Sequence, residues 1–311
     1  MDILKNTNKD KLQKITLVAV SALTLLALVL LLVIIMASVD KSMGDNKVDD
    51  IVDSLEFESK PITSTQLVTG SLVLADSDHP YSTDASLLDL IDFKTYRNNM
   101  LREDGIDPAV TENLPYQPYT GMQLNEEAIV LAHKMLVDAV KAVSQGSITV
   151  DGAYGRQENK GNIKATDFSE FDTGLLVFLA DKTSDGTASK YVPLSEDYVK
   201  WFQKNAAKYG FSKSFENGYR YVGTVHAKYM TDKDLSLSQY IEYLKKNTSH
   251  DKPLTVKDSD GTSYGIYYVA CKDGDSVNLP VISDGNGENN AVSYEISGTN
   301  EGGIIVTVKL N

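Results

Sequence analysis

The amino-acid sequence predicts a membrane-anchored chain in which helices and strands are mixed, followed by a small carboxyl-terminal β module. Three observations lead to this prediction. Residues 15–37 are almost wholly apolar, apolar side chains recur every three or four positions over residues 125–143, and short β-type runs alternate with turns after residue 250. With 311 residues, the chain is long enough to bury a substantial core.

The apolar run at residues 15–37 predicts a transmembrane helix, because about 20 such residues cross a bilayer. Four lysines precede the run and five aspartates follow it, so the positive-inside rule places the amino terminus in the cytoplasm. The run is longer than a usual signal-peptide core and no clear Ala-x-Ala site follows, which favours an anchor over a cleaved signal. We therefore expect a cytoplasmic tail at 1–14, the membrane helix at 15–37, and an extracytoplasmic stalk at 38–65.

Charge and cysteine usage restrict the partners and the compartment. Lys and Arg total 30 against 43 Asp and Glu, which gives a formal net charge of −13. Long-range attraction to nucleic acid would have the wrong sign, so we expect no nucleic-acid partner. The single cysteine, Cys271, allows no intrachain disulfide. This cysteine usage is typical of a protein on the outside of a Gram-positive type of cell and not of a disulfide-rich secreted scaffold.

The first half of the folded part begins near Gln66 in our prediction. Residues 82–123 contain turn formers and no long periodic run, so we expect irregular structure there. Residues 125–143 carry acidic residues in a first turn and then a regular apolar stripe, which predicts an amphipathic helix. Residues 147–151 predict a strand. The continuous apolar run at 174–180 predicts a central strand that is buried on both faces.

The second half contains two further helices and then short strands. The first helix is capped by Ser195 and ends at Gly210, and the second spans residues 237–246. We predict one folded domain at 66–250 and an antiparallel β module at 251–311. The β-type runs of that module are 254–257, 264–270, 292–296 and 303–309.

Three motifs resemble those of one enzyme family. Residues 169–178 have the spacing of Ser-x-His-x-x-Gly-x-Ala-x-Asp, and residues 201–211 are similar to Trp-x-x-x-Asn-Ala-x-x-Tyr-Gly-Phe. Residues 219–223 keep the end of a Glu-x-Trp-His-x-Arg-Tyr-Val-Gly motif. Over roughly residues 66 to 247, the chain resembles the zinc-dependent D-alanyl-D-alanine carboxypeptidases of the VanY type. The resemblance implies an α+β fold, a mostly antiparallel sheet with helices packed against it.

The same resemblance predicts that the usual chemistry is lost. It implies that three positions correspond to the zinc ligands, and these positions hold Phe171, Phe178 and Gly218. Zinc needs imidazole, thiolate or carboxylate donors, which none of these residues supplies. We therefore expect no catalytic residue, no metal site and no zinc cofactor. Glu216 lies two residues before Gly218 and not three, as the general base of the family does, so we do not assign it that role.

A peptide groove is a further implication of the resemblance. In the family, the Arg of a Ser-Gly-Tyr-Arg-Ser signature holds the terminal carboxylate of the substrate peptide, since a guanidinium can pair both oxygens. In this chain Tyr154 keeps the register, Gly155 takes the Arg position and Arg156 follows one residue late. We name Tyr154, Arg156, Ser169 and Thr173 as candidate groove residues, with a solvated surface side chain as the alternative for Arg156.

Phe171 and Phe178 lead to a structural prediction. They are seven residues apart, so they would face opposite ways on one regular strand. A turn at residues 172–174 could bring them to one site, as it does the ligands of the family. We then expect the two rings to fill the former metal pocket and to gain apolar burial there.

Other candidate sites have simpler explanations. None of the four histidines pairs with another at the spacing of a metal site. Ser38 and Lys41 form a Ser-x-x-Lys pair, but it lies at the membrane exit without a suitable fold around it. The segment from Asp284 to Glu295 imitates the oxygen spacing of a calcium loop, with a hairpin loop as the alternative. The histidines are His79, His133, His226 and His250.

Three hypotheses for function follow. The first is a membrane-anchored extracytoplasmic pseudoenzyme that binds peptidoglycan stem peptide or a membrane-protein partner. The second is an active D-Ala-D-Ala metallocarboxypeptidase in peptidoglycan maturation, which would need two histidines and one carboxylate to converge on a groove. The third is a structural subunit of a cell-surface assembly, which an exposed apolar patch would favour.

Overall fold

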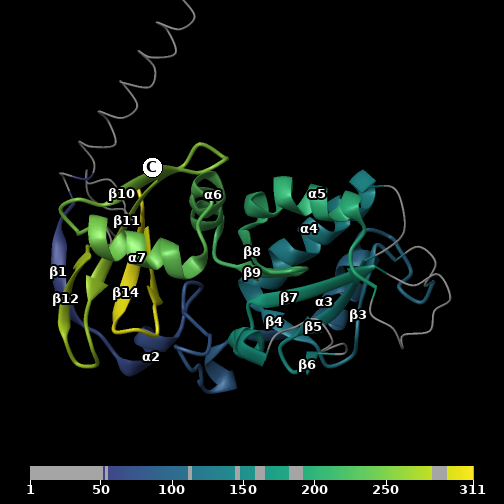
Figure 1. The fold of residues 1–311 in the computed structure, drawn as a ribbon, viewed down its shortest axis with the longest axis horizontal. Helices are drawn as coiled ribbons and strands as arrows, with labels where there is room; N and C mark the ends of the chain where they lie inside the picture. The colour runs from purple at the N-terminus through teal and green to yellow at the C-terminus, as the bar shows by residue number, and fades with distance from the viewer. Residues whose placement is uncertain are drawn as a thin grey trace, which may run out of the picture. The chain divides into compact units, whose positions relative to one another are not determined.

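The strand predicted at residues 174–180 lies in the middle of a six-stranded sheet in the computed structural model (Figure 1). The strand order is β3-β5-β7-β9-β8, and β6 pairs with β5. β3 and β5 are parallel, whereas the other neighbours are antiparallel, so the sheet is mostly antiparallel. The strands are β3 (Tyr116–Pro118), β5 (Ile148–Ala153), β6 (Arg156–Gln157), β7 (Leu176–Asp181), β8 (Phe211–Phe215) and β9 (Gly218–Tyr221).

Part of the chain lies outside this description. The structure describes Val52 and residues 55–110, 114–143, 148–157, 165–181, 192–281 and 293–310. The predicted tail at 1–14, the predicted membrane helix at 15–37 and the pair Ser38 and Lys41 lie outside these residues, as does Asp284 of the predicted calcium loop. Of the helices within the described ranges, none combines the length and apolar character that crossing a bilayer requires.

The two faces of the six-stranded sheet carry different side chains. Val177 and Leu179 of β7 share a buried cluster with two helices that cover one face (Figure 1). Leu176 and Phe178 point to the opposite face and belong to a separate cluster, because successive side chains alternate along a strand. β7 is therefore buried on both faces, as predicted. The helices are α4 (Glu126–Val143) and α5 (Glu196–Asn205).

A second sheet, in the order β10-β11-β14-β13, is antiparallel throughout. Val225, Tyr240 and Leu244 of two helices share a buried cluster with Ile266 and Ile305 of this sheet. The helices thus cover the apolar face of the sheet. The elements are α6 (Thr224–Lys233), α7 (Leu237–Asn247), β10 (Leu254–Lys257), β11 (Ser263–Ala270), β13 (Ser293–Gly298) and β14 (Gly303–Lys309).

Two predicted boundaries differ from the structure. The predicted stalk at 38–65 contains β1 (Phe57–Pro61), which pairs with β12 (Ser276–Pro280), so the fold begins before Gln66. The predicted β module at 251–311 has no separate core, because its sheet is covered by helices that precede residue 250. Leu55–Asn311 accordingly form one compact unit. A sheet with an apolar face needs a covering layer, and here the preceding helices supply it.

The prediction of irregular structure at 82–123 was wrong for its middle part. Residues Phe93–Glu103 form α3, and Asp92 caps the helix by accepting a hydrogen bond of 2.7 Å from the backbone nitrogen of Thr95. The buried stripe of this helix contains Arg97, whose Nη1 donates to the carbonyl oxygen of Tyr116 at 2.9 Å. A charged residue at a core-facing position interrupts the apolar period, so the helix was missed.

The other long elements follow the sequence pattern. The helices predicted at 125–143, 195–210 and 237–246 are confirmed, as are the four β-type runs after residue 250. Ser195 is at the N-cap of α5, although its side chain makes no capping bond, and Gly210 ends the following turn with φ of 79°. The remaining elements are α2 (Ser64–Val68), η1 (Ala85–Leu87), β2 (Leu90–Asp92), β4 (Gln123–Asn125), η3 (Ala165–Thr173) and η4 (Ala206–Tyr209).

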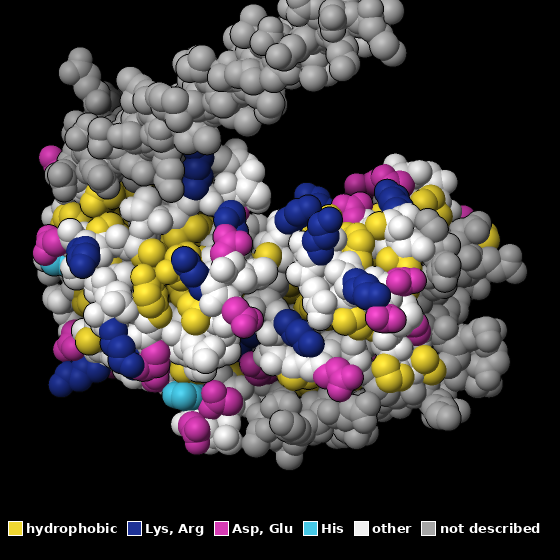
Figure 2. All heavy atoms as spheres, turned by 45° about the horizontal axis from the view of Figure 1, so that its top comes forward, with side chains coloured by type: hydrophobic (Ala, Val, Ile, Leu, Met, Phe, Trp, Pro, Cys, Tyr) yellow, Lys and Arg dark blue, Asp and Glu magenta, His cyan; other side chains and the backbone are white. Residues whose placement is uncertain are grey.

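The face of the molecule seen in Figure 2 carries charges of both signs with apolar side chains between them.

Candidate functional site

Phe171 and Phe178 come together at one buried site. Phe171 is 0% exposed at the end of η3, and Phe178 is 1% exposed on β7. Gly174, with φ of 70°, lets the chain turn from η3 into the strand. Both rings pack in one cluster with Leu176 and with Phe215, whose ring centroid lies 6.3 Å from that of Phe171 and 6.0 Å from that of Phe178. We call these three phenylalanines the aromatic cluster.

Gly218 and Gly152 leave the space that the aromatic cluster occupies. Phe178 is the strand partner of both glycines, which lie on the neighbouring strands β9 and β5. A Cβ atom at Gly218 would lie 2.6 Å from the Phe215 ring, and one at Gly152 would lie 2.8 Å from Cε1 of Phe171. The expectation that the two rings would be packed and buried at one place is therefore confirmed, and Phe215 completes the filling.

The residues at these three positions do not fit a zinc ion. A phenyl ring offers no lone pair, and Gly218 has no side chain, whereas zinc binds nitrogen, sulfur or carboxylate oxygen. Among the residues that the structure describes, no three His, Cys, Asp or Glu side chains are grouped as metal ligands.

The four histidines lie in separate surroundings. His226 is 5% exposed, and burial lowers its pKa to about 4, so it is neutral near pH 7. No two histidines share a partner in their hydrogen bonds and ion pairs. Their partners are Asp76 and Glu301 for His79, Tyr116 for His133, Tyr240 and Thr307 for His226, and Asp251 for His250.

A buried arginine lies beside the aromatic cluster, on the same face of β9 as Gly218. The side chain of Arg220 is 2% exposed, and its Nη2 donates to the carbonyl oxygen of Val73 at 2.5 Å. Its Nη1 lies 3.8 Å from Oε1 of Glu170, which also accepts a hydrogen bond from Ser214. Burial lowers the pKa of Arg220, and the carboxylate of Glu170 opposes that shift. Arg220 lines a cavity of about 140 Å³ with Glu170 and Ser214.

The contacts of the candidate groove residues are as follows. Thr173 is 2% exposed, and its hydroxyl donates to the carbonyl oxygen of Glu170 at 2.6 Å, so it closes a turn. Ser169 donates to the carbonyl oxygen of Ala75 at 2.7 Å. Tyr154 is half-buried and its backbone bridges to Gln123. Arg156 pairs through its backbone with Ala153, and its side chain lies outside the description.

Sequence reasoning missed two residues of the aromatic cluster site, Phe215 and Gly152. Phe215 lies three residues before Gly218, and the shortened segment between them forms a tight turn from β8 to β9. Gly152 follows the predicted strand at 147–151. A glycine directly after a buried strand, opposite a large aromatic residue, would have been the available signal.

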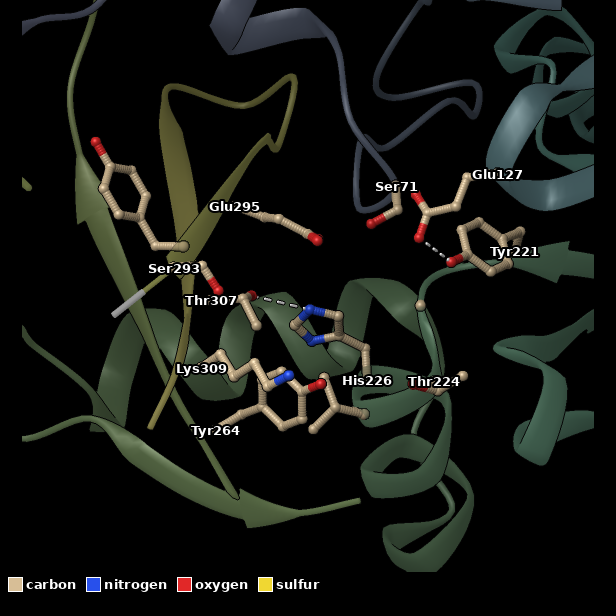
Figure 3. A pocket seen from close by; sticks show the side chains of 13 residues that line it. Ser71, Glu127, Tyr221, Thr224, His226, Tyr264, Ser293, Glu295, Thr307 and Lys309 are labelled. Atoms are coloured by element: carbon tan, nitrogen blue, oxygen red, sulfur yellow. Dashed lines mark hydrogen bonds between the residues drawn. The ribbon is translucent and has the colours of Figure 1, made fainter. Parts of the chain in front are cut away.

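An open pocket lies on the other side of β9 (Figure 3). Its volume is about 410 Å³, and its walls come from α4, β9, α6 and the second sheet. The phenol of Tyr221 donates to Oε1 of Glu127 at 2.6 Å, and Oγ1 of Thr307 lies 3.0 Å from Nε2 of His226. Glu295 points into the space between these two pairs (Figure 3). We call this space the junction pocket.

Comparison of the sequence with those of known proteins supports the resemblance. No family model matches the chain. A D-alanyl-D-alanine carboxypeptidase of Enterococcus faecium is 25% identical over 272 residues, which are 81% of this chain and 79% of that protein. The chain therefore resembles the D-alanyl-D-alanine carboxypeptidases of the VanY type.

The solved structure of one such enzyme has a similar fold. The vancomycin-resistance D,D-dipeptidase VanXYg, in complex with a D-Ala-D-Ala phosphinate analogue, has a TM-score of 0.59 and 19% identity, over 82% of this chain and 99% of that chain. The vancomycin-resistance D,D-pentapeptidase VanY in complex with Zn(II) has a TM-score of 0.35 and 17% identity, over 55% of this chain and 98% of that chain. The fold is thus the mixed α+β fold of VanXYg.

Proposed function

We propose that this protein is a non-catalytic relative of the D-alanyl-D-alanine carboxypeptidases that acts by binding. The observation that supports this proposal is the aromatic cluster. The resemblance implies that Phe171, Phe178 and Gly218 correspond to the zinc-ligand positions, and Phe215 fills the space next to Gly218. All three donors are replaced together, although the loss of one would already open the coordination sphere of a zinc ion.

Burial of the two rings supports the proposal that this site does not bind a metal ion. Fully burying a phenylalanine side chain contributes on the order of 2 kcal/mol relative to leaving it exposed. Phe171 and Phe178 are both buried completely or nearly so. A metal ion could enter this site only if both rings moved out of it. The protein would then lose their apolar burial and would gain no metal ligand. The site stabilises the fold in its present form.

The ligand that we propose is a peptidoglycan stem peptide ending in D-Ala-D-Ala. The support is the similarity to a D-alanyl-D-alanine carboxypeptidase and to a D,D-dipeptidase in complex with a D-Ala-D-Ala phosphinate analogue. A membrane-protein partner is the alternative within the same proposal. In this chain the guanidinium of Arg220 lines the cavity beside the aromatic cluster, and its positive charge can attract a peptide carboxylate.

We also propose that the protein is anchored in the cell membrane with its folded part outside the cytoplasm. The apolar run at 15–37, the lysines before it and the aspartates after it support this orientation. Digestion of intact cells or spheroplasts with an added protease tests it. We expect the folded part to be cleaved from outside, and protection of the whole chain would contradict the proposal.

The test of the main proposal uses the full chain, purified with detergent, and a peptide ending in D-Ala-D-Ala. With zinc supplied in the buffer, we expect no release of D-alanine, whereas the similar Enterococcus faecium enzyme serves as the active control. We expect saturable binding of the same peptide by calorimetry. Release of D-alanine would overturn the non-catalytic proposal and favour an unrecognised metal site. Absence of both hydrolysis and binding would favour a structural subunit.

A further inference from the structure

The junction pocket is lined by two carboxylates and one lysine that form no ion pair within the described part of the chain. We infer that this pocket binds a small zwitterion, an amino acid or a dipeptide whose ammonium and carboxylate groups are both free. This inference does not rest on the proposed function. The pocket lies on the side of β9 that carries Tyr221, whereas the aromatic cluster lies on the side that carries Gly218.

Two carboxylates form one wall of the pocket. Glu127 is held in place by the phenol of Tyr221 at 2.6 Å, and Glu295 extends from β13 toward it (Figure 3). Within the described ranges, Glu295 has neither a hydrogen-bond partner nor an ion-pair partner for its carboxylate. Burial and the negative charge of Glu127 both raise the pKa of Glu295. Two carboxylates that repel each other across a cavity favour a cation between them.

One lysine supplies the opposite charge. Lys309 of β14 pairs in register with Ser293 on one side and with Tyr264 on the other, and all three line the pocket. Its ammonium group makes no ion pair with any residue in the described part of the chain. Thr307, two residues earlier and on the same face, pairs in register with Glu295. Lys309 and Glu295 are therefore diagonal neighbours on adjacent strands, roughly 7 Å apart at the backbone.

The opposite charges on the two sides of the pocket indicate which class of ligand it binds. A cation in the pocket would be repelled by the ammonium of Lys309. An anion would be repelled by the carboxylates of Glu127 and Glu295. A zwitterion satisfies both walls at once. A dipeptide of two extended residues spans about 7 Å, and a pocket of about 410 Å³ is large enough for such a small ligand.

The hydroxyl groups around the pocket are consistent with this ligand. Ser71 lies beside Glu127, and Ser293 and Tyr264 lie beside Lys309 (Figure 3). Hydroxyl groups both donate and accept, so they can hydrogen-bond an ammonium group, a peptide group or a carboxylate. His226, by contrast, uses both ring nitrogens within the protein, on Tyr240 and Thr307, so it forms part of the wall.

Calorimetric titration of the full chain with glycine and diglycine tests the inference. We expect saturable binding of at least one of the two. N-acetyl-diglycine lacks the ammonium group and diglycine amide lacks the carboxylate, and each should bind at least about tenfold more weakly than diglycine. Absence of binding by both glycine and diglycine, or equal binding of the blocked compounds, would overturn the inference.

Two pairs of variants locate the site. Glu295→Gln and Lys309→Met should each weaken diglycine binding at least about tenfold. The matched controls Glu216→Gln and Lys257→Met change exposed residues outside the pocket and should leave the affinity unchanged. Saturable calcium binding that Glu295→Gln abolishes, without any binding of the glycine compounds, would show a cation site and contradict the zwitterion. These titrations measure no hydrolysis, so their failure would leave the proposed non-catalytic function standing.

Discussion

The aromatic cluster and the junction pocket lie on opposite faces of the same strand, β9, and they differ in every physical respect. Gly218 faces a site that is filled by three phenyl rings, whereas Tyr221 faces a cavity of about 410 Å³. The first site is formed by apolar rings, and Phe171 and Phe178 are buried. The second keeps the carboxylate of Glu295 and the ammonium of Lys309 open to the cavity. The junction pocket therefore presents charged groups on the face of β9 opposite the position that the resemblance assigns to catalysis.

The largest effect should come from emptying the aromatic cluster. Phe178 is 1% exposed, so Phe178→Ala should lower the free energy of unfolding by about 3 to 5 kcal/mol through lost burial and a residual cavity. Chemical denaturation of the full chain measures this change. Leu87→Ala is the control, because Leu87 is 44% exposed and its loss should cost less than about 0.5 kcal/mol. Similar costs for the two variants would show that the cluster is not a packed core.

The wall of the junction pocket should respond to acid through His226. Burial holds the pKa of His226 at about 4, below the ordinary value of 6.5, so the unfolded chain takes up a proton first as the pH falls. Stability from this group is present above pH 6.5 and is lost between pH 6.5 and about 4, by up to about 3 kcal/mol. The difference in unfolding free energy between these two pH values measures it.

The control for this prediction is His226→Gln, which cannot titrate in that range. The variant should be less stable at pH 7, but it should lose about 3 kcal/mol less than the unchanged protein on going to pH 4. An identical pH dependence in both proteins would assign the acid sensitivity to other groups.

A smaller effect should follow from a methyl group added beside the aromatic cluster. In Gly152→Ala the new Cβ would lie 2.8 Å from Cε1 of Phe171, and overpacking of this kind costs about 1 to 3 kcal/mol. Gly265→Ala is the matched control on another strand, because its nearest atom, Cβ of Pro253, lies at 3.5 Å and neither glycine has a positive φ. Unfolding free energies compare the two, and an equal cost would mean that the space beside Phe171 is not closed.

The smallest effect should be the pH dependence of diglycine binding in the junction pocket. The pKa of Glu295 is raised above its ordinary value of 4.5, so this carboxylate becomes neutral earlier than a free one as the pH falls. Affinity should therefore decrease between pH 7 and pH 4, since the ligand ammonium loses its partner. Calorimetry at the two pH values tests this in the protein without substitutions. If Glu295→Gln binds diglycine with the same pH dependence, Glu295 is not the group that contacts the ammonium.

Much of the fold could be predicted because its elements have clean patterns. The apolar run at 174–180 predicted a buried strand, and the apolar stripe at 125–143 predicted an amphipathic helix. The structure contains both. α3 was missed because Arg97 occupies a core-facing position and finds a carbonyl partner only through the tertiary fold. β1 was missed because its partner, β12, lies more than 200 residues away in the sequence.

The candidate sites could be predicted only in part. The meeting of Phe171 and Phe178 followed from motif spacing, since the turn before β7 brings both rings to one site, whereas Gly218 joins them as the strand partner of Phe178. Thr173 was assigned to a groove because a hydroxyl in a turn is equally suited to bind a ligand or to close the backbone, and the structure uses it for the backbone. The junction pocket gave no local signal, because its walls come from segments between Ser71 and Lys309 that only folding brings together.

The most direct test of the central claim is the zinc content of the full chain after growth in zinc-supplemented medium, measured by mass spectrometry together with D-alanine release. We predict much less than one zinc ion per chain and no release of D-alanine, because the positions that the resemblance assigns to the metal hold Phe171, Phe178 and Gly218. One zinc ion per chain together with turnover would contradict the account.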